Sequence, residues 1–275
     1  MDYTQSREYL AHRYELDALP DFPLADEPFV HEWKIWLENP NESPPDVKDI
    51  LSDDATASWL EKTSAGKIPV IYTRSRTSFE RVHGVLYPGG FAAGIPMSVN
   101  AFTIKAKHPA LPGHRIILLN HSGYSALSGK ELGMEEEMWI EQSKTLRIYH
   151  EICHYFSLRV LGGMRNHLLD EIAADCMGQL AVFGVFRASL QRLFFGISQE
   201  GGSGKILPGA RFSFYVKKLP GASVDMVLEE TLSALSSLEN YLTRKPDMTL
   251  EPNRPLLVTK LLTAGISGIR GLSAR

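Results

Sequence analysis

The chain has 275 residues, of which 44% are hydrophobic and 22% charged, and its formal net charge is −3 at pH 7. This composition is typical of one large globular domain or two subdomains, and the near-neutral charge argues against nucleic acid as the main partner. The longest apolar tract, Leu180 to Ile197, contains Arg187, Gln191 and Arg192, so no segment is expected to span a membrane. The N-terminus is polar and lacks an apolar signal segment, so a cytoplasmic protein is expected.

The first part of the chain, residues 1–66, is expected to be a mostly helical lead-in. Residues 29–37 (FVHEWKIWL) have the apolar spacing of a helix. A loop is expected from Asn41 to Pro45. Asp53 is then placed to begin a second short helix that ends at Leu60.

The second part, residues 67–161, is expected to combine strands with one long helix. Four runs are rich in β-branched and apolar residues and are separated by Gly- and Pro-containing turns. These predicted strands are Ile68–Tyr72, Val82–Tyr87, Ala101–Ala106 and Arg115–Asn120. A Gly- and Ser-rich loop follows them and leads into the helix.

The most informative motif of the chain lies in this helix, as the string His150-Glu151-Ile152-Cys153-His154. At 3.6 residues per turn, His150 and His154 share one face, and Glu151 lies beside it. Two neutral imidazoles one turn apart can hold a zinc ion, and a neighbouring carboxylate can take a proton from water activated by that ion. The flanking residues are largely apolar, which indicates a buried helix whose polar groups need partners. Gly162 and Gly163 are expected to end the helix.

The third part, residues 162–275, is expected to be helical, with stretches at 167–196, about 223–244 and about 255–265. A Gly-rich break falls at Gly201–Gly204. Asn166 is the expected N-cap of the first stretch.

This first stretch offers a third metal ligand, because Glu171 and Asp175 share a face of the predicted helix. Glu171 could bind the metal while Asp175 accepts a hydrogen bond from a ligand imidazole. His167, one turn before Glu171, is the competing ligand and would give a three-histidine site. Glu171 is preferred because it lies deeper in the helix, whereas His167 sits at its fraying first position.

The pattern of His150-Glu151-x-x-His154 followed by Glu171-x-x-x-Asp175 resembles the gluzincin branch of the zincin metallopeptidases. The resemblance covers about residues 146–179. It implies one zinc ion held by His150, His154 and Glu171, with Glu151 as general base. It also implies that Asp175 lies behind a ligand histidine.

The resemblance further implies a zincin-like α+β fold, in which a mixed sheet packs on the motif helix and a helical part lies below. In such enzymes an edge strand holds the substrate backbone, and Arg115–Asn120 is expected in that role because it is the last strand before the helix. His121 and Tyr124 would then lie at one end of the cleft. Thermolysin-like members carry an oxyanion-binding histidine downstream of the third ligand, but no His follows His167 here. Possible oxyanion or substrate contacts are therefore His167, His121 and Tyr124.

These observations predict a zinc-dependent metallopeptidase that acts on a peptide or protein substrate. Two alternatives remain: a non-catalytic metal-binding protein on a zincin scaffold, and a metal-dependent hydrolase of another substrate. The chain has two cysteines, Cys153 and Cys176, which we expect to be reduced and buried. A deformylase-type site needs a cysteine ligand upstream of the motif, and none precedes Cys153.

Overall fold

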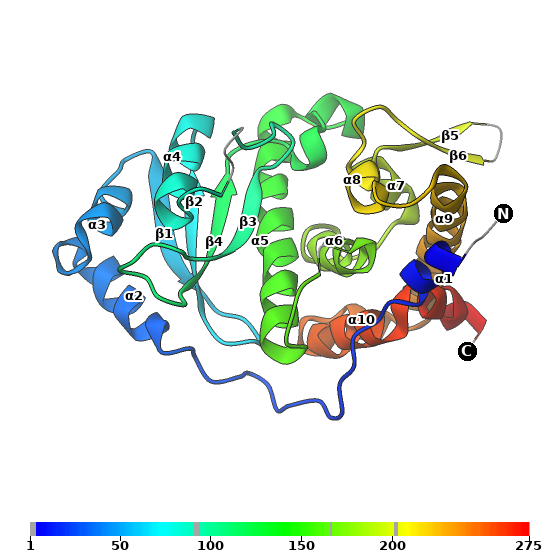
Figure 1. Ribbon diagram of the computed structural model, residues 1–275, viewed down its shortest axis with the longest axis horizontal. Coiled ribbons are helices and arrows are strands. Elements are labelled where there is room, and N and C mark those ends of the chain that lie inside the picture. Colours follow the sequence, from blue (N-terminus) through cyan, green and yellow to red (C-terminus); the bar gives the residue numbers. More distant parts are fainter. Residues whose placement is uncertain (1–3, 91–93, 166, 201–202, 275) are drawn as a thin grey trace. The chain divides into compact units, whose positions relative to one another are not determined.

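The fold is known from a computed structural model that describes residues 4–90, 94–165, 167–200 and 203–274 (Figure 1). Helices and a small mixed sheet make it an α+β protein, which confirms the predicted class. None of the helices among these residues is long and apolar enough to cross a membrane.

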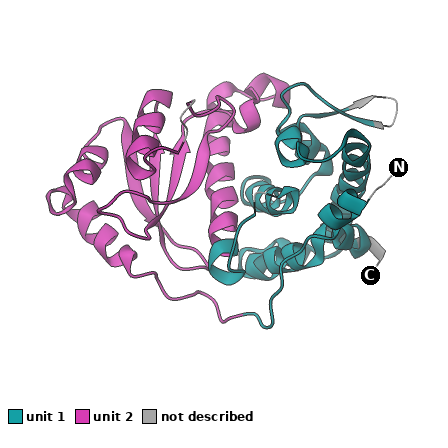
Figure 2. Ribbon diagram, in the orientation of Figure 1, with its two compact units in different colours: residues 1–19, 157–275 teal, residues 20–156 magenta. Residues whose placement is uncertain are grey.

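The chain forms two compact units (Figure 2). Residues 20–156 form one of them, called here the sheet unit. Residues 1–19 and 157–275 form the other, called the helical unit. The units divide the chain differently from the three predicted segments, because the first 19 residues group with the C-terminal part.

The sheet unit is built on a four-stranded sheet with the order β1-β2-β4-β3. Its strands are β1 (Thr56–Glu61), β2 (Ile68–Thr73), β3 (Ala101–Lys105) and β4 (Arg115–Asn120). β2 and β4 are parallel and the other two pairings are antiparallel, so the sheet is mixed as predicted. Three of the four predicted strands are confirmed as β2, β3 and β4.

β4 lies inside the sheet, which overturns its predicted role as the substrate-holding edge strand. Ile117 of β4 faces Val70 of β2 on one side and Thr103 of β3 on the other. The backbone of β4 therefore pairs with a neighbouring strand on each side, and the edge strands of this sheet are β1 and β3. The order of strands along the chain does not give their order in space. The continuous burial of residues 116–120 is the mark of a central strand.

The segment Val82–Tyr87 was predicted to be a strand, and this prediction is wrong. It belongs to helix α4 (Arg76–Leu86) and to the cap that follows it. The side chain of Ser75 accepts a backbone hydrogen bond in the first turn, which fixes the start of the helix. Phe79 and Leu86 lie seven residues apart on one face, and both are fully buried.

The helix predicted between Asp53 and Leu60 is also wrong, because β1 occupies most of this segment. Asp53 instead shapes a turn in which its Oδ1 accepts a hydrogen bond from the amide of Ala55, at 2.8 Å. The helix of this region comes earlier, as α3 (Pro45–Leu51). A short 3₁₀ helix, η1 (Pro40–Glu42), occupies part of the predicted loop.

The core of the sheet unit lies between the sheet and helices α2 (Phe29–Glu38), α3 and α4. α2 was predicted correctly, and its Trp33 is fully buried. The burial of apolar area in this cluster is the main stabilisation of the unit. Its largest members include Trp33, Trp36, Ile50, Ile71, Phe79, Leu86 and Leu118.

The motif helix is α5 (Glu136–Val160), which lies beside the sheet in Figure 1. Two 3₁₀ helices precede it, η2 (Tyr124–Ala126) and η3 (Gly129–Leu132). Gly162 has a φ of 73°, a left-handed conformation that ends the helix as predicted.

The helical unit is built around α6 (Leu168–Phe183), whose residues 168–180 are all buried. Its other helices are α1 (Thr4–Ala11), α7 (Ala188–Phe195), α8 (Arg211–Val216), α9 (Gly221–Arg244) and α10 (Arg254–Arg270). α10 packs against α1, α6 and α9. The 3₁₀ helices η4 (Pro246–Thr249), η5 (Glu251–Asn253) and η6 (Gly271–Ala274) complete it.

The long helix predicted at 167–196 is broken into α6 and α7. Gly184 adopts a φ of 68° and caps α6, so the chain turns before α7 begins. A two-stranded hairpin of β5 (Ile197–Glu200) and β6 (Ser203–Ile206) follows and was not predicted. Of the predicted break at Gly201–Gly204, residues 201–202 lie outside the described residues, as does the predicted N-cap Asn166.

Candidate metal centre

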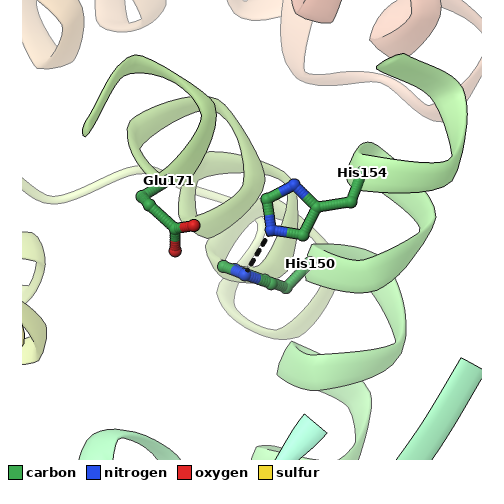
Figure 3. A group of neighbouring side chains, drawn as sticks. All are labelled: His150, His154 and Glu171. Carbon is green, nitrogen blue, oxygen red and sulfur yellow. Dashed lines mark hydrogen bonds between the residues drawn. The ribbon is translucent and has the colours of Figure 1, made fainter. Parts of the chain in front are cut away.

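The two histidines of the motif lie one turn apart on α5, and both are buried. Their Nε2 atoms face each other at 2.9 Å (Figure 3). Both rings therefore present the same ligand atom to one small space, as the helical spacing of His150 and His154 predicts.

Glu171 of α6 completes a group of three possible ligands with these histidines. One ligand atom from each of His150, His154 and Glu171 lies within 4.8 Å of the other two, and all three side chains are buried (Figure 3). Among the described residues this is the group of three that could hold a metal ion, and His167 does not belong to it. Two imidazole nitrogens and one carboxylate oxygen match the donor set of open, catalytic zinc sites.

The other ring nitrogen of His150 contacts Tyr124, a predicted substrate or oxyanion contact. The hydroxyl of Tyr124 lies 2.9 Å from Nδ1 of His150, and both side chains are buried. A group at this position orients the ring and fixes which nitrogen carries the proton. Tyr124 thus lies behind a proposed ligand.

Glu151, the proposed base, is 5% exposed and is held by a residue that the sequence did not single out. The hydroxyl of Thr103 lies 2.8 Å from Oε2 of Glu151 and 3.0 Å from its backbone oxygen. Thr103 belongs to β3, an edge strand of the sheet. This contact joins the base to the edge of the sheet.

A second unpredicted residue, Arg211 of α8, binds the carboxylates of α6. Its guanidinium donates to Oε2 of Glu171 and forms two hydrogen bonds with Asp175, of 2.9 and 3.1 Å. Gln191 also donates to Asp175, at 2.5 Å. These bonds fix Asp175, while its predicted role as the partner of a ligand imidazole stays a prediction.

Tyr215 adds a further contact to the same carboxylate. Its hydroxyl accepts a hydrogen bond from Nε of Arg211 at 3.2 Å and is hydrogen-bonded to Glu171. Burial raises the pKa of Tyr215 well above its ordinary value. Tyr215 is therefore a neutral donor that helps to hold Glu171.

His167 caps the helix that carries Glu171. Its Nδ1 accepts a hydrogen bond from the amide of Leu169 at 3.1 Å, and Asp170 closes a capping box with the His167 amide. Its ring lies 3.9 Å from that of Tyr9. Burial, and then the nearby His12, lowers the pKa of His167 to about 3. The contacts of His167 lie within the helical unit and do not include the ligand group, so it caps α6 and is not a ligand, while its predicted role as an oxyanion or substrate contact stays a prediction.

His121 lies just after β4 and is exposed. Its Nδ1 is hydrogen-bonded to the hydroxyl of Tyr72. Burial, followed by the charge of Glu141, raises the pKa of Tyr72. A role for His121 in substrate contact remains a prediction.

Both cysteines are free and buried. Burial raises the pKa of the Cys176 thiol, which keeps it protonated and unreactive. This agrees with the expectation of two reduced cysteines.

In a comparison with known protein families, the chain matches a family model described as "Family of unknown function (DUF7005)". It matches residues 97–264, which include α5, Glu171 and Arg211. Comparisons with curated proteins and with solved structures found no match.

Proposed function

The chain belongs to DUF7005, a family of unknown function, and from the geometry of its buried ligand group we propose that it is a zinc-dependent metallopeptidase. The observation that carries the proposal is the convergence of His150, His154 and Glu171 within 4.8 Å. Glu151 directly follows His150 in the chain, and its side chain is also buried.

The residues present fit a zinc ion. Two imidazole nitrogens and one carboxylate oxygen, all from buried side chains, lie within 4.8 Å of one another, and each is a donor of a type that binds zinc. Three protein ligands leave a fourth position for water or substrate, which is the arrangement of catalytic rather than structural zinc. An intact carboxylate beside the ligands also favours catalysis over a non-catalytic scaffold, because a structural site needs no base.

When bound, zinc supplies Lewis-acid activation of water and of the scissile carbonyl. The chain supplies the rest of the chemistry. Glu151 takes a proton from the attacking water and delivers it to the leaving amine nitrogen. Thr103 holds one oxygen of Glu151 at 2.8 Å and so restricts the orientation of the carboxylate. Arg211 and Tyr215 keep Glu171 in place from behind.

The sheet supports a peptide or protein as substrate. β3 is an edge strand, and one of its residues, Thr103, contacts the base. A substrate segment that adds to β3 as a further strand would bring its backbone close to Glu151. The combination of a mixed sheet, α5 and helices after it is the arrangement expected of a zincin-like fold, which we include in the proposal.

The test combines metal analysis with a peptide-library digest. We expect about one equivalent of zinc in the reloaded protein and cleavage of library members. Glu151→Gln should keep its zinc because Glu151 is not a ligand, while cleavage falls by a factor of about 10² or more because the base is lost. Glu141→Gln, a matched change at an exposed position of α5, should leave both quantities unchanged.

Two outcomes would contradict the role of Glu151 as the general base. Loss of zinc from Glu151→Gln would make Glu151 a ligand. Full cleavage by Glu151→Gln would exclude it as the base. A wild-type protein that binds zinc and cleaves no peptide would favour the hydrolase or scaffold alternatives.

A further inference from the structure

One face of α5 holds the loop formed by residues 120–127. Trp139, Ser143, Arg147 and His150 are spaced by four, four and three residues, so they share this face. Each of them hydrogen-bonds the loop. The next residue of the same face is His154. The row of side chains that binds the loop therefore continues directly into the proposed metal ligands.

Arg147 makes the most unusual of these contacts. It is 3% exposed, and its guanidinium donates to the carbonyls of Ser122 and Gly123, both at 2.6 Å, and to the hydroxyl of Ser122 at 3.0 Å. A charge buried on neutral acceptors costs several kcal/mol of desolvation, which these hydrogen bonds offset in part. Burial lowers the pKa of Arg147 to about 10, so it stays charged at neutral pH. Its guanidinium fixes the two residues just before Tyr124.

The rest of the loop is held as closely. The amide of Tyr124 donates to the Ser143 hydroxyl at 2.9 Å, and Nε1 of Trp139 donates to the carbonyl of Leu127 at 2.8 Å. A Cβ atom added at Gly123 would lie 2.1 Å from that same carbonyl oxygen, so only glycine fits there.

The loop also contains two strained residues. Ser125 and Ala126 have φ values of 52° and 59°, a left-handed conformation that residues other than glycine rarely adopt. Such strain persists only where the surroundings fix the backbone, and it is concentrated at functional sites. The strain here directly follows Tyr124.

This arrangement affects the ring of His150. If Nε2 of His150 bound zinc, the ring proton would have to lie on Nδ1, and the Tyr124 hydroxyl, 2.9 Å from this atom, would accept it. We propose that loop 120–127, fixed by Arg147, positions Tyr124 so that it sets the ring orientation and tautomer of His150 for metal binding. Tyr124 and Arg147 are positioning residues in this scheme. The inference deepens the proposed function and rests on it for the metal.

The first measurement is the zinc affinity of Tyr124→Phe, by competition with a chelator. Tyr124→Phe keeps the ring that packs in the loop and removes the hydroxyl, so we expect zinc to bind about 10- to 100-fold more weakly. Arg147→Met should weaken zinc binding similarly, because it releases the loop. Tyr87→Phe removes a hydroxyl elsewhere in the sheet unit. Arg76→Met removes a guanidinium that binds the carbonyls of another loop, residues 95–99. Both controls should bind zinc as the wild type does.

The second measurement needs no metal and separates this inference from the proposed function. Nitrogen NMR of the metal-free protein, with His150 assigned from a His150→Asn spectrum, gives the tautomer of this ring. We expect one tautomer in the wild type and a mixture in Tyr124→Phe. Unchanged zinc affinity and an unchanged tautomer in Tyr124→Phe would overturn the inference. If the wild type binds no zinc, the proposed function fails, and a mixed tautomer in the wild type would then overturn the inference as well.

Discussion

Glu171 is the proposed ligand that lies outside the motif helix, so its replacement tests the composition of the metal centre. Glu171→Ala leaves two imidazoles, and we expect zinc affinity to fall by a factor of roughly 10² or more, beyond the usual effect of residues behind the ligands. His167→Ala should keep zinc, because its ring caps α6 and lies outside the ligand group. A zinc titration of the two variants decides the matter. The reverse pattern would exclude Glu171 as a ligand and make His167 the third ligand.

The sequence predicts those residues of the site whose positions follow from the local helical period. His150 and His154 meet because a helix repeats every 3.6 residues, and their ligand atoms face each other as expected. Thr103 and Arg211 could not be found this way. They contact Glu151 and Glu171 across 48 and 40 residues of sequence, and such contacts leave no periodic pattern.

At the scale of the element, the cap of α6 can be tested through stability. His167→Ala removes the acceptor of a first-turn amide, so we expect the free energy of unfolding to fall by about 1 kcal/mol. His167→Asn should recover part of this loss, because asparagine is a strong N-cap residue. Urea denaturation of the three proteins measures the effect. An asparagine variant no more stable than the alanine variant would show that the loss comes from the ring contact with Tyr9 instead.

The elements themselves were predicted where one face of a segment is clearly apolar. α2 follows its pattern because its buried side chains all lie in one core cluster, and β2 is a short apolar run that is buried along its whole length. Val82–Tyr87 and Asp53–Leu60 were misread, because windows of six to eight residues fit either period. Their true conformations depend on Ser75, which starts α4, and on Asp53, which turns the chain into β1. The inner position of β4 depends on pairings that no local pattern contains.

For the whole molecule, buried histidines make stability depend on pH. Burial lowers the pKa of four histidines in the folded protein: His12, His83, His114 and His167. Below about pH 6.5 the unfolded chain therefore binds more protons than the folded one. The contribution to stability is complete above that pH and is lost as the pH falls towards the lower folded values.

We expect the metal-free protein to lose of the order of 1–2 kcal/mol of unfolding free energy between pH 7 and pH 5, with His167 as the largest contributor. Urea denaturation at a series of pH values, with a chelator present, measures the change. His167→Asn should flatten the curve, whereas a change at the exposed His31 should not. Stability that stays constant or rises on acidification would contradict the expectation.

The assembly of the helical unit from both ends of the chain has a consequence for biosynthesis. The hydroxyl of Ser267 donates a hydrogen bond to the carbonyl of Leu10 across 257 residues, and the backbone amide of Tyr14 donates to the carbonyl of Leu262 at 2.9 Å. At about 5–20 residues per second, the ribosome needs roughly 13–50 s to make the partner of Leu10 after Leu10 itself. The sheet unit is one continuous segment and is complete well before then. Leu10, 4% exposed in the finished fold, therefore stays accessible to chaperones until Ser267 has been made.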